Sequence, residues 1–271
     1  MKIGVWVNTR AAHQVEWCGA FAAGLRRHGI DVLCDDWVNA EACDLAVFWG
    51  HHRHAYIRGQ QARGGDYLVV ERGYWRRQEL CSLGFNGLHG EADYTHWNDG
   101  GARWRQHGVP LRPWADRKDG YVLIMGQVAG DASLGGLDVV AWVSETAPAI
   151  ADMTGCDAWF RPHPGARQVM PEGVKVRPFA ESLEAALAGA RMVVTWSSTS
   201  GVDAALCGVP VVALSPVSMA RDVAAHELVP WPPMPDRTMW THRLARRQWT
   251  LAELANGEAW EHLRRRYEGA A

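Results

Sequence analysis

Four hydroxyl side chains in a row follow an apolar run in the second half of the chain. Residues 191–196 (RMVVTW) are typical of a buried strand, and a helical pattern begins at Gly201. Between them stand Ser197, Ser198, Thr199 and Ser200. The start of a helix carries partial positive charge and unpaired N–H groups that bind phosphate oxygens. One Ser or Thr is enough to cap a helix, so we predict that these four residues bind a phosphate group, with a simple helix cap as the alternative.

Two other loops at expected strand ends carry groups that suit a diphosphate. In RPHPG, two prolines stiffen the turn and hold Arg161 and His163 towards one point. The stretch QVAGDAS adds Gln127, Asp131 and Ser133. These polar groups could hold a ribose, a phosphate or the start of a helix. Phe179 ends the run VKVRPF and could pack against a nucleobase or in the core.

Alternating strand and helix patterns must position these loops. Between residues 121 and 216, short apolar runs alternate with segments whose apolar residues recur every three or four positions. Such alternation predicts a parallel sheet covered by helices, with its ligand beyond the carboxyl ends of the strands. The first part of the chain repeats the pattern, with a helix expected at residues 16–29 and strands at 2–8, 31–36, 44–50 and 66–73. Residues 75–118 show no clear period and predict long loops with short helices.

In this order, QVAGDAS, RPHPG and the Ser/Thr-rich turn before SGVDAALCGVPVVAL resemble the donor half of GT-B glycosyltransferases. They are most similar to capsule-polysaccharide, sialyl and Kdo transferases that use an HP motif and a Ser/Thr motif. The resemblance covers residues 120–216 and assigns the donor phosphate to His163 and the hydroxyls at 197–200. It implies a nucleotide sugar as co-substrate in the C-terminal lobe, an acceptor in the N-terminal lobe, and no cofactor or obligatory metal. The short first half, rich in Trp and Arg, departs from these families.

We therefore predict the α/β class, with two Rossmann-like lobes that contain parallel sheets and a cleft between them, as in GT-B proteins. Residues 1–115 would form the acceptor lobe and residues 120–235 the donor lobe. The Pro-containing stretch 110–120 suits a linker between them. Residues 236–271 would form a basic helical tail.

Transfer of a sugar to a hydroxyl needs a general base, and a strand end of the first lobe is the expected place for it. Glu71 follows the apolar run YLVV directly, and the neighbouring Arg72 could pair with it. His13, in the loop after the first strand, is the second candidate, because some GT-B enzymes that glycosylate small molecules carry a catalytic His there. The carboxylates that remain possible are Glu16, Asp36 and Asp93.

Residues 51–118 mix eleven Arg or Lys residues with several Trp and Tyr residues. Basic side chains neutralise phosphates and aromatic rings stack bases, so we expect double-stranded DNA as acceptor, with a flipped 5-hydroxymethylpyrimidine as the target. The block SLGFNGLHGEADY (82–94), with ERGYW, resembles a block of phage-encoded proteins. The candidate acceptor-binding residues are Arg72, Tyr74, Trp75, Asn86 and His89. A capsule or cell-surface saccharide as acceptor, and a non-catalytic nucleotide- or DNA-binding module, are the alternatives.

Composition narrows the class of protein. The 271 residues are 48% hydrophobic and carry a formal net charge of -2. No apolar run reaches the length of a membrane span, and the first residues lead directly into a strand pattern, so we expect a cytoplasmic protein. The six Cys residues never occur in CxxC or zinc-ligand spacing, and the cluster HHRH at 51–54 has no evident distant fourth ligand. We therefore expect reduced cysteines and no metal site.

Overall fold

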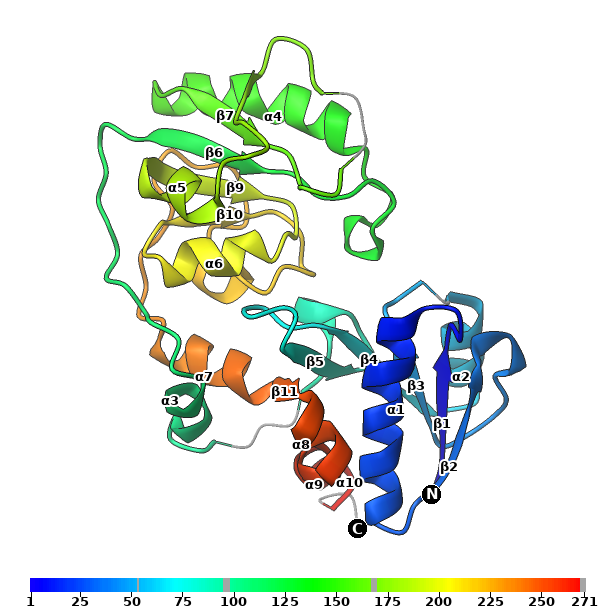
Figure 1. Ribbon diagram of the computed structural model, residues 1–271. Coiled ribbons are helices and arrows are strands. Elements are labelled where there is room, and N and C mark those ends of the chain that lie inside the picture. The colour runs from blue at the N-terminus through cyan, green and yellow to red at the C-terminus, as the bar shows by residue number, and fades with distance from the viewer. Residues whose placement is uncertain (53, 95–97, 167–169, 269–271) are drawn as a thin grey trace. The chain divides into compact units, whose positions relative to one another are not determined.

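The computed structural model describes residues 1–52, 54–94, 98–166 and 170–268, and the chain forms two compact units (Figure 1). The first unit joins Met1–His107 with Thr241–Ala271, and the second is Gly108–Trp240. In each unit, helices cover a sheet that is largely or wholly parallel. The predicted class, α/β with two Rossmann-like lobes, is confirmed.

Among the described residues, the sheet of the first unit has six strands in the order β11-β5-β4-β3-β1-β2. Four are parallel: β1 (Lys2–Val7), β2 (Asp31–Asp36), β3 (Leu45–Trp49) and β4 (Asp66–Arg72). The other two, β5 (Leu80–Phe85) and β11 (Gln248–Thr250), pair in the antiparallel sense. Strands β1, β3 and β4 are mostly apolar because both faces of the sheet are covered.

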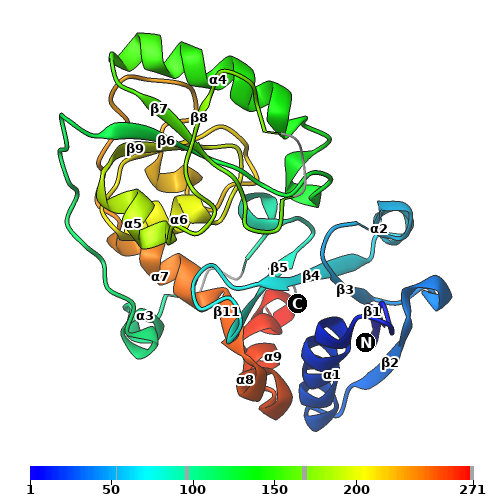
Figure 2. The same cartoon turned by 45° about the horizontal axis from the view of Figure 1, so that its top comes forward.

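Helix α1 (Ala12–Arg27) packs on one face of this sheet, and helix α2 (His54–Ala62) lies on the other (Figure 1, Figure 2). Phe21 and Leu25 of α1 are fully buried against apolar side chains of β1, β3 and β4. Helices α8 (Leu251–Asn256) and α9 (Glu258–Leu263) pack beside α1 and add Leu254 and Trp260 to the same core. The shorter helical elements of this unit are η1 (Trp37–Asn39), η2 (His89–Glu91), α3 (Ala102–His107) and α10 (Arg265–Glu268).

The structure corrects two expectations for this unit. Residues 75–118 are not only loops and short helices, because β5 is a fully buried strand between β4 and β11. Its sequence LCSLGF hides this, since Ser82 and Gly84 interrupt the apolar run. The expected separate tail is instead part of the first unit, because β11 extends its sheet and α8 and α9 complete the core around α1.

The sheet of the second unit is wholly parallel over its described strands, in the order β10-β9-β6-β7-β8. These strands are β6 (Tyr121–Met125), β7 (Ala158–Arg161), β8 (Lys175–Val176), β9 (Ala190–Thr195) and β10 (Val211–Ala213). Helix α4 (Val139–Thr154) covers one face, and α5 (Leu183–Ala188) and α6 (Ser200–Leu206) cover the other (Figure 2). Asp138 starts α4 by accepting from two backbone N–H groups, and Gly155 ends it in the left-handed conformation.

The remaining described elements connect these layers. Two 3-10 helices, η3 (Ala132–Leu134) and η4 (Arg221–Val223), follow β6 and β10 in the second unit. Helix α7 (Thr238–Arg246) contains the boundary at which the chain returns to the first unit. Of the helices in the described part of the chain, none combines the length and the apolar character needed to cross a membrane.

Candidate functional site

The loops after β6 and β9 are joined by a buried hydrogen-bond network at the carboxyl edge of the second sheet. The Gln127 side-chain nitrogen donates to the hydroxyls of Ser133 and Ser197, both at 3.0 Å. The backbone N–H of Ser197 donates in return to the Gln127 side-chain oxygen at 2.9 Å. All three side chains are buried. These hydrogen bonds tie the two loops together, and direct contact of the three side chains with a donor stays a prediction.

Some of the hydroxyls in the turn after β9 form hydrogen bonds within the turn itself. Thr195 Oγ1 accepts from the backbone N–H of Ser198 at 3.0 Å, and Ser198 Oγ accepts from the N–H of Ser200 at 3.3 Å. Ser198 is buried like Ser197, whereas Thr199 and Ser200 are half-buried. Thr199 is the N-cap residue of α6, and its side chain makes no cap hydrogen bond. Thr199 and Ser200 are thus the two hydroxyls that this turn presents at the surface.

Asp131 caps the 3-10 helix η3. The backbone N–H of Ser133 donates to Asp131 Oδ1 at 2.8 Å, and the Ser133 hydroxyl donates to the same oxygen at 2.6 Å. Of the three roles that the sequence left open for Asp131, the structure shows the helix cap.

The loop after β7 lies against the loop after β6. The backbone N–H of Gly126 donates to the Arg161 carbonyl at 2.9 Å. A side chain at Gly126 would meet the Phe160 ring at 2.9 Å, so this close approach requires glycine. The Arg161 guanidinium donates to the Glu181 carbonyl at 3.0 Å, and its Nε is buried with no hydrogen-bond partner in the described part of the chain.

His163 and Phe179 are two of the predicted donor-binding residues, and both are exposed. His163 is exposed, and its Nδ1 accepts from the backbone N–H of Gly165 at 3.0 Å, which orients the ring in the turn. Phe179 follows β8 and is 54% exposed. Beside it in the sequence, Arg177 pairs with Glu181, and this hydrogen bond lowers the pKa of the Glu181 carboxyl. An exposed ring at the strand ends can stack on a nucleobase.

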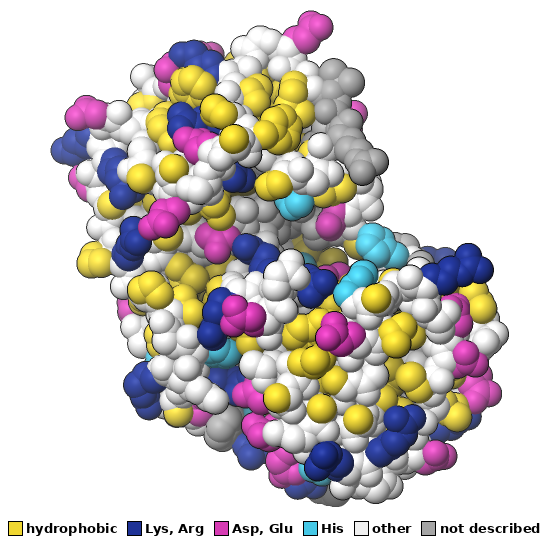
Figure 3. All heavy atoms as spheres, in the orientation of Figure 1, with side chains coloured by type: hydrophobic (Ala, Val, Ile, Leu, Met, Phe, Trp, Pro, Cys, Tyr) yellow, Lys and Arg dark blue, Asp and Glu magenta, His cyan; other side chains and the backbone are white. Residues whose placement is uncertain are grey.

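In the first unit, Trp49 brings His13 and Arg72 together at the carboxyl ends of β3 and β4. The His13 ring packs edge-on against Trp49 with 5.0 Å between the ring centroids. The Arg72 guanidinium carbon lies over the Trp49 ring, 5.4 Å from its centroid. The pKa of His13 is lowered by burial and, next, by the Arg72 charge, so His13 is neutral at neutral pH and able to accept a proton. Histidine side chains gather at this end of the first unit (Figure 3).

Sequence reasoning missed Trp49. The signal that could have found it is a large aromatic residue at the last position of an apolar strand, where the parallel strands of the sheet end at a common edge.

Glu71 points to the face of β4 opposite to Arg72, because successive side chains of a strand alternate. The ion pair expected between them is therefore not formed. The backbone N–H of Arg72 donates to Glu71 Oε2 at 3.2 Å instead. Glu71 lines a small pocket together with Ser82, His89 and Tyr94. His13 and Glu71 thus lie at the same edge of the sheet but on opposite faces of β4.

Tyr74 and Trp75 are core residues. Tyr74 is fully buried, and its hydroxyl lies 3.2 Å from the hydroxyl of Tyr94. Trp75 is 5% exposed, and its ring packs edge-on against Trp104. The prediction that they bind an acceptor is wrong, because neither ring is accessible.

Asn86 and His89 shape the turn after β5. Asn86 has a left-handed backbone, and its amide accepts from the Tyr67 N–H at 3.0 Å and donates to Asp66 at 2.6 Å. The carbonyl of His89 accepts from the Tyr94 hydroxyl at 2.9 Å. These contacts lie within the protein, and binding of an acceptor by Asn86, His89 or Arg72 stays a prediction.

The other possible bases have different surroundings. Asp36 accepts from the backbone N–H and the hydroxyl of Thr9, and these hydrogen bonds lower its pKa. Asp93 forms an ion pair with Arg266. Glu16 is exposed on α1. Asp36 and Asp93 are thus each held by a partner, and Glu16 is exposed, so His13 and Glu71 stay the two candidate bases.

The aromatic side chains of residues 51–118 are largely used for packing. Trp97 lies outside the described residues. Tyr67, Tyr74 and Trp75 are buried, and packing contacts with neighbouring side chains involve Tyr56, Tyr94, Trp104 and Trp114. These contacts reduce the number of rings that could stack on a base.

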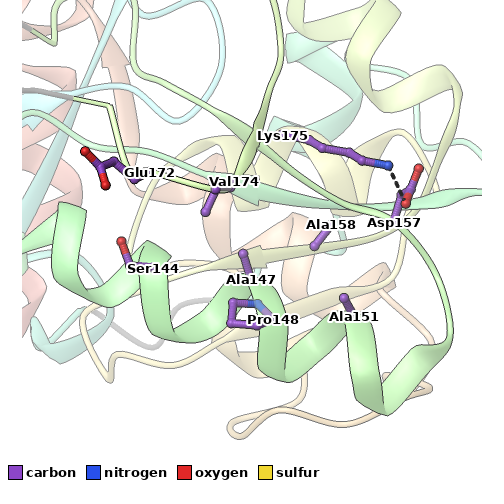
Figure 4. Close-up of a pocket in the computed structure, with 10 residues that line it drawn as sticks. Ser144, Ala147, Pro148, Ala151, Asp157, Ala158, Glu172, Val174 and Lys175 are labelled. Atoms are coloured by element: carbon purple, nitrogen blue, oxygen red, sulfur yellow. Dashed lines mark ion pairs between the residues drawn. The ribbon is translucent and has the colours of Figure 1, made fainter.

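Two larger pockets lie away from the strand-end loops. One, of about 260 Å³, lies between α4 and the amino ends of β7 and β8, with Pro148 on its floor and the Lys175–Asp157 ion pair on its rim (Figure 4). The other, of about 290 Å³, is lined by Arg103, Trp249 and His262 of the first unit, among others. In doubly wound sheets the ligand binds at the carboxyl ends of the strands, so neither pocket is the expected donor site.

The described residues contain no group of three His, Cys, Asp or Glu side chains arranged to hold a metal ion. In the cluster HHRH, Arg53 and the side chain of His54 lie outside the described residues. His51 is close to the Tyr67 hydroxyl, at 3.3 Å.

Comparisons with known proteins give a match in structure. No family model matches the sequence, and no curated protein matches it. The structure is similar to two solved structures of KpsC from Thermosulfurimonas dismutans. The first, a beta Kdo 2,4 transferase, has a TM-score of 0.58 at 15% identity and covers 90% of each chain. The second, a beta Kdo 2,7 transferase, has a TM-score of 0.58 at 11% identity and covers 90% of this chain and 89% of that one.

The chain shares its fold with these two proteins. At such low identity the likeness shows the GT-B-like fold, and the reaction must be argued from the site.

Proposed function

We propose that the protein is a glycosyltransferase that moves a sugar from a nucleotide-sugar donor to an acceptor hydroxyl. The observation that supports this most is the structural match across 90% of the chain to a protein named as a Kdo transferase. The polar loops at the carboxyl edge of the second sheet could bind the donor, and His13 could act as the general base.

The second unit is proposed to bind the donor. Arg161 and His163 would neutralise the donor phosphates, Thr199 and Ser200 would donate hydrogen bonds to them, and Phe179 would stack on the nucleobase. The buried network of Gln127, Ser133 and Ser197 would hold these loops in place. We propose that neither a metal nor another cofactor is needed, because side chains of the protein supply the positive charge.

The first unit is proposed to bind the acceptor. His13 would take the proton from the acceptor hydroxyl while that oxygen forms a bond to the anomeric carbon of the sugar. The bond between the anomeric carbon and the donor phosphate oxygen breaks, and the nucleotide leaves with that electron pair. A base in this role speeds the step by about 10² to 10⁴. Glu71 is the second candidate for the base.

The acceptor that we propose is a saccharide, with DNA as the alternative. DNA with a flipped hydroxymethylpyrimidine needs rings that stack on the base, and Tyr74 and Trp75 are buried in the core. The surplus of basic residues in 51–118 is the observation that still favours DNA. Transfer to hydroxymethylated duplex DNA, to unmodified DNA and to glycans, measured side by side, separates these acceptors.

The donor site is tested by a thermal-shift screen of UDP-, CMP-, GDP- and CDP-linked sugars, because a ligand that binds only the folded state raises the melting temperature. His163→Asn keeps a side-chain oxygen that can accept from the Gly165 N–H but removes the imidazole, so it should leave the unliganded melting temperature unchanged and reduce the donor-induced rise. A full rise in this variant would refute the donor assignment. Full activity in excess chelator is expected if no metal is required.

The base is tested by comparing His13→Gln with Glu71→Gln. We expect His13→Gln to lower the transfer rate at least a hundredfold with unchanged donor binding, and Glu71→Gln to have a much smaller effect. The reverse order would assign the base to Glu71. Donor binding without turnover on any acceptor would favour a non-catalytic nucleotide-binding module.

A further inference from the structure

The Arg72 side chain is a cation without an opposite charge beside it. Its guanidinium carbon lies 5.4 Å from the centroid of Trp49, and the residue is half-buried. Across the described residues, no carboxylate or carbonyl accepts a hydrogen bond from this guanidinium. Glu71, its neighbour in the chain, points to the other face of the strand. Charged groups that are withdrawn from water are usually paired, so this group is ready to receive an anion.

The surroundings of Arg72 limit what that anion can be. Trp49 supports the guanidinium, and His13 packs against the same ring. A guanidinium binds a carboxylate or a phosphate through two parallel hydrogen bonds. A single guanidinium on Trp49, next to His13, suits one anionic group on a small ligand, whereas a nucleic-acid backbone is usually held by several basic residues.

We propose that Arg72, supported by Trp49, forms an anion-binding subsite that holds a carboxylate or phosphate carried by a saccharide acceptor, next to the hydroxyl that His13 deprotonates. Arg72 would contact the acceptor, and Trp49 would act as a positioning residue. The assignment of this anion to an acceptor rests on the proposed transferase function. The anion site itself can be measured without any turnover.

The first test follows the titration of His13 by NMR in the full-length protein, with the His13 signal identified from its loss in His13→Gln. The probes are inorganic phosphate and acetate. An anion held on Arg72 screens its charge, so each probe that binds should raise the pKa of His13 in the wild type. In Arg72→Gln the pKa should already be higher, and the probes should not change it. Arg58→Gln is the matched control, because Arg58 is an exposed residue of α2 in the same unit and should behave as the wild type.

The second test measures binding of methyl glucuronide, which carries a carboxylate, against neutral methyl glucoside. The wild type and Arg58→Gln should bind the glucuronide at least tenfold more tightly, and Arg72→Gln should lose this preference. Arg72→Lys keeps the charge but not the two parallel donors, and should retain only part of it. Trp49→Ala should weaken glucuronide binding and change the His13 pKa, whereas Trp49→Phe should preserve both.

The outcomes separate the claims. A His13 pKa that responds equally to the anions in the wild type and in Arg72→Gln would overturn the subsite. Competition by a duplex oligonucleotide that abolishes glucuronide binding and weakens steeply with salt would overturn the saccharide in favour of nucleic acid. Anion binding through Arg72 in a protein that turns over no nucleotide sugar would support the site and refute the transferase function. Transfer that does not depend on Arg72 would support the transferase function and refute the role of Arg72 in binding the acceptor.

Discussion

We expect Gln127 to contribute most to the shape of the loops at the carboxyl edge of the second sheet. Among other contacts, replacing it with Ala removes the two hydrogen bonds that it donates to Ser133 and Ser197 and the one that it accepts from the Ser197 N–H. Each such bond contributes a net of about 0.5–1.5 kcal/mol, and leaving the buried N–H without a partner costs about 1–3 kcal/mol. Because these terms overlap, we expect Gln127→Ala to lower the free energy of unfolding by about 3 kcal/mol.

Urea unfolding followed by far-UV circular dichroism measures this change. Gln127→Met keeps most of the side-chain volume and removes the polar groups. The stability that this variant loses therefore reports the hydrogen bonds, without the cavity that Ala would leave. Ser133→Ala removes one donor–acceptor partner and should cost about 1 kcal/mol. The reasoning is refuted if Gln127→Ala costs less than about 0.5 kcal/mol, the range of an ordinary surface change. We also expect Gln127→Met to reduce donor binding, because the loops after β6 and β9 would lose the hydrogen bonds that join them.

Three further predictions concern the first unit. Burial, with the charges of nearby arginines, lowers the pKa of His262 to about 4, so the unfolded chain binds a proton at this residue more tightly than the folded chain does. The free energy of unfolding should therefore fall by about 3 kcal/mol between pH 6.5 and pH 4. In urea titrations, His262→Gln should remove this part of the pH dependence. Trp260→Ala should lower the free energy of unfolding by about 3–5 kcal/mol, since the ring is buried in the core around α1. In the same assay, Arg264→Ala, which removes an exposed ion pair, should lower it by less than about 1 kcal/mol. Arg103→Ala should cost about 3–5 kcal/mol by denaturation, because it leaves Glu253 buried without its two hydrogen bonds from Arg103, and adding Glu253→Gln should recover part of that loss.

The second unit could be predicted closely because its signals are local. Its central strands are apolar runs buried on both faces, and turn residues separate them from amphipathic helices. The same method failed for β5 and β11 of the first unit. Strand β11 has three residues, and Thr250 pairs with Leu80 in a distant part of the chain. No local pattern identifies a strand whose partner is so far away.

The role of a polar residue was harder to predict than its position. The hydroxyls after β9 do reach the carboxyl edge of the sheet, but Ser197 is used by Gln127 and Ser198 accepts from the N–H of Ser200. A run of hydroxyls in a sequence does not distinguish residues that serve the protein from residues that serve a ligand. Burial makes that distinction, and it moves the proposed phosphate contacts towards Thr199, Ser200 and His163.

The end of β4 links the choice of base to the nature of the acceptor. Adjacent side chains of a strand point in opposite directions, so Arg72 shares its face with Trp49 and His13, while Glu71 faces the small pocket that His89 and Tyr94 also line. We therefore expect an acceptor whose anion lies on Arg72 to present its hydroxyl to His13. If Glu71→Gln abolished transfer and His13→Gln did not, the reacting hydroxyl would lie on the other face of the strand. That single result would contradict both the assignment of His13 as base and the role of Arg72 in binding the acceptor.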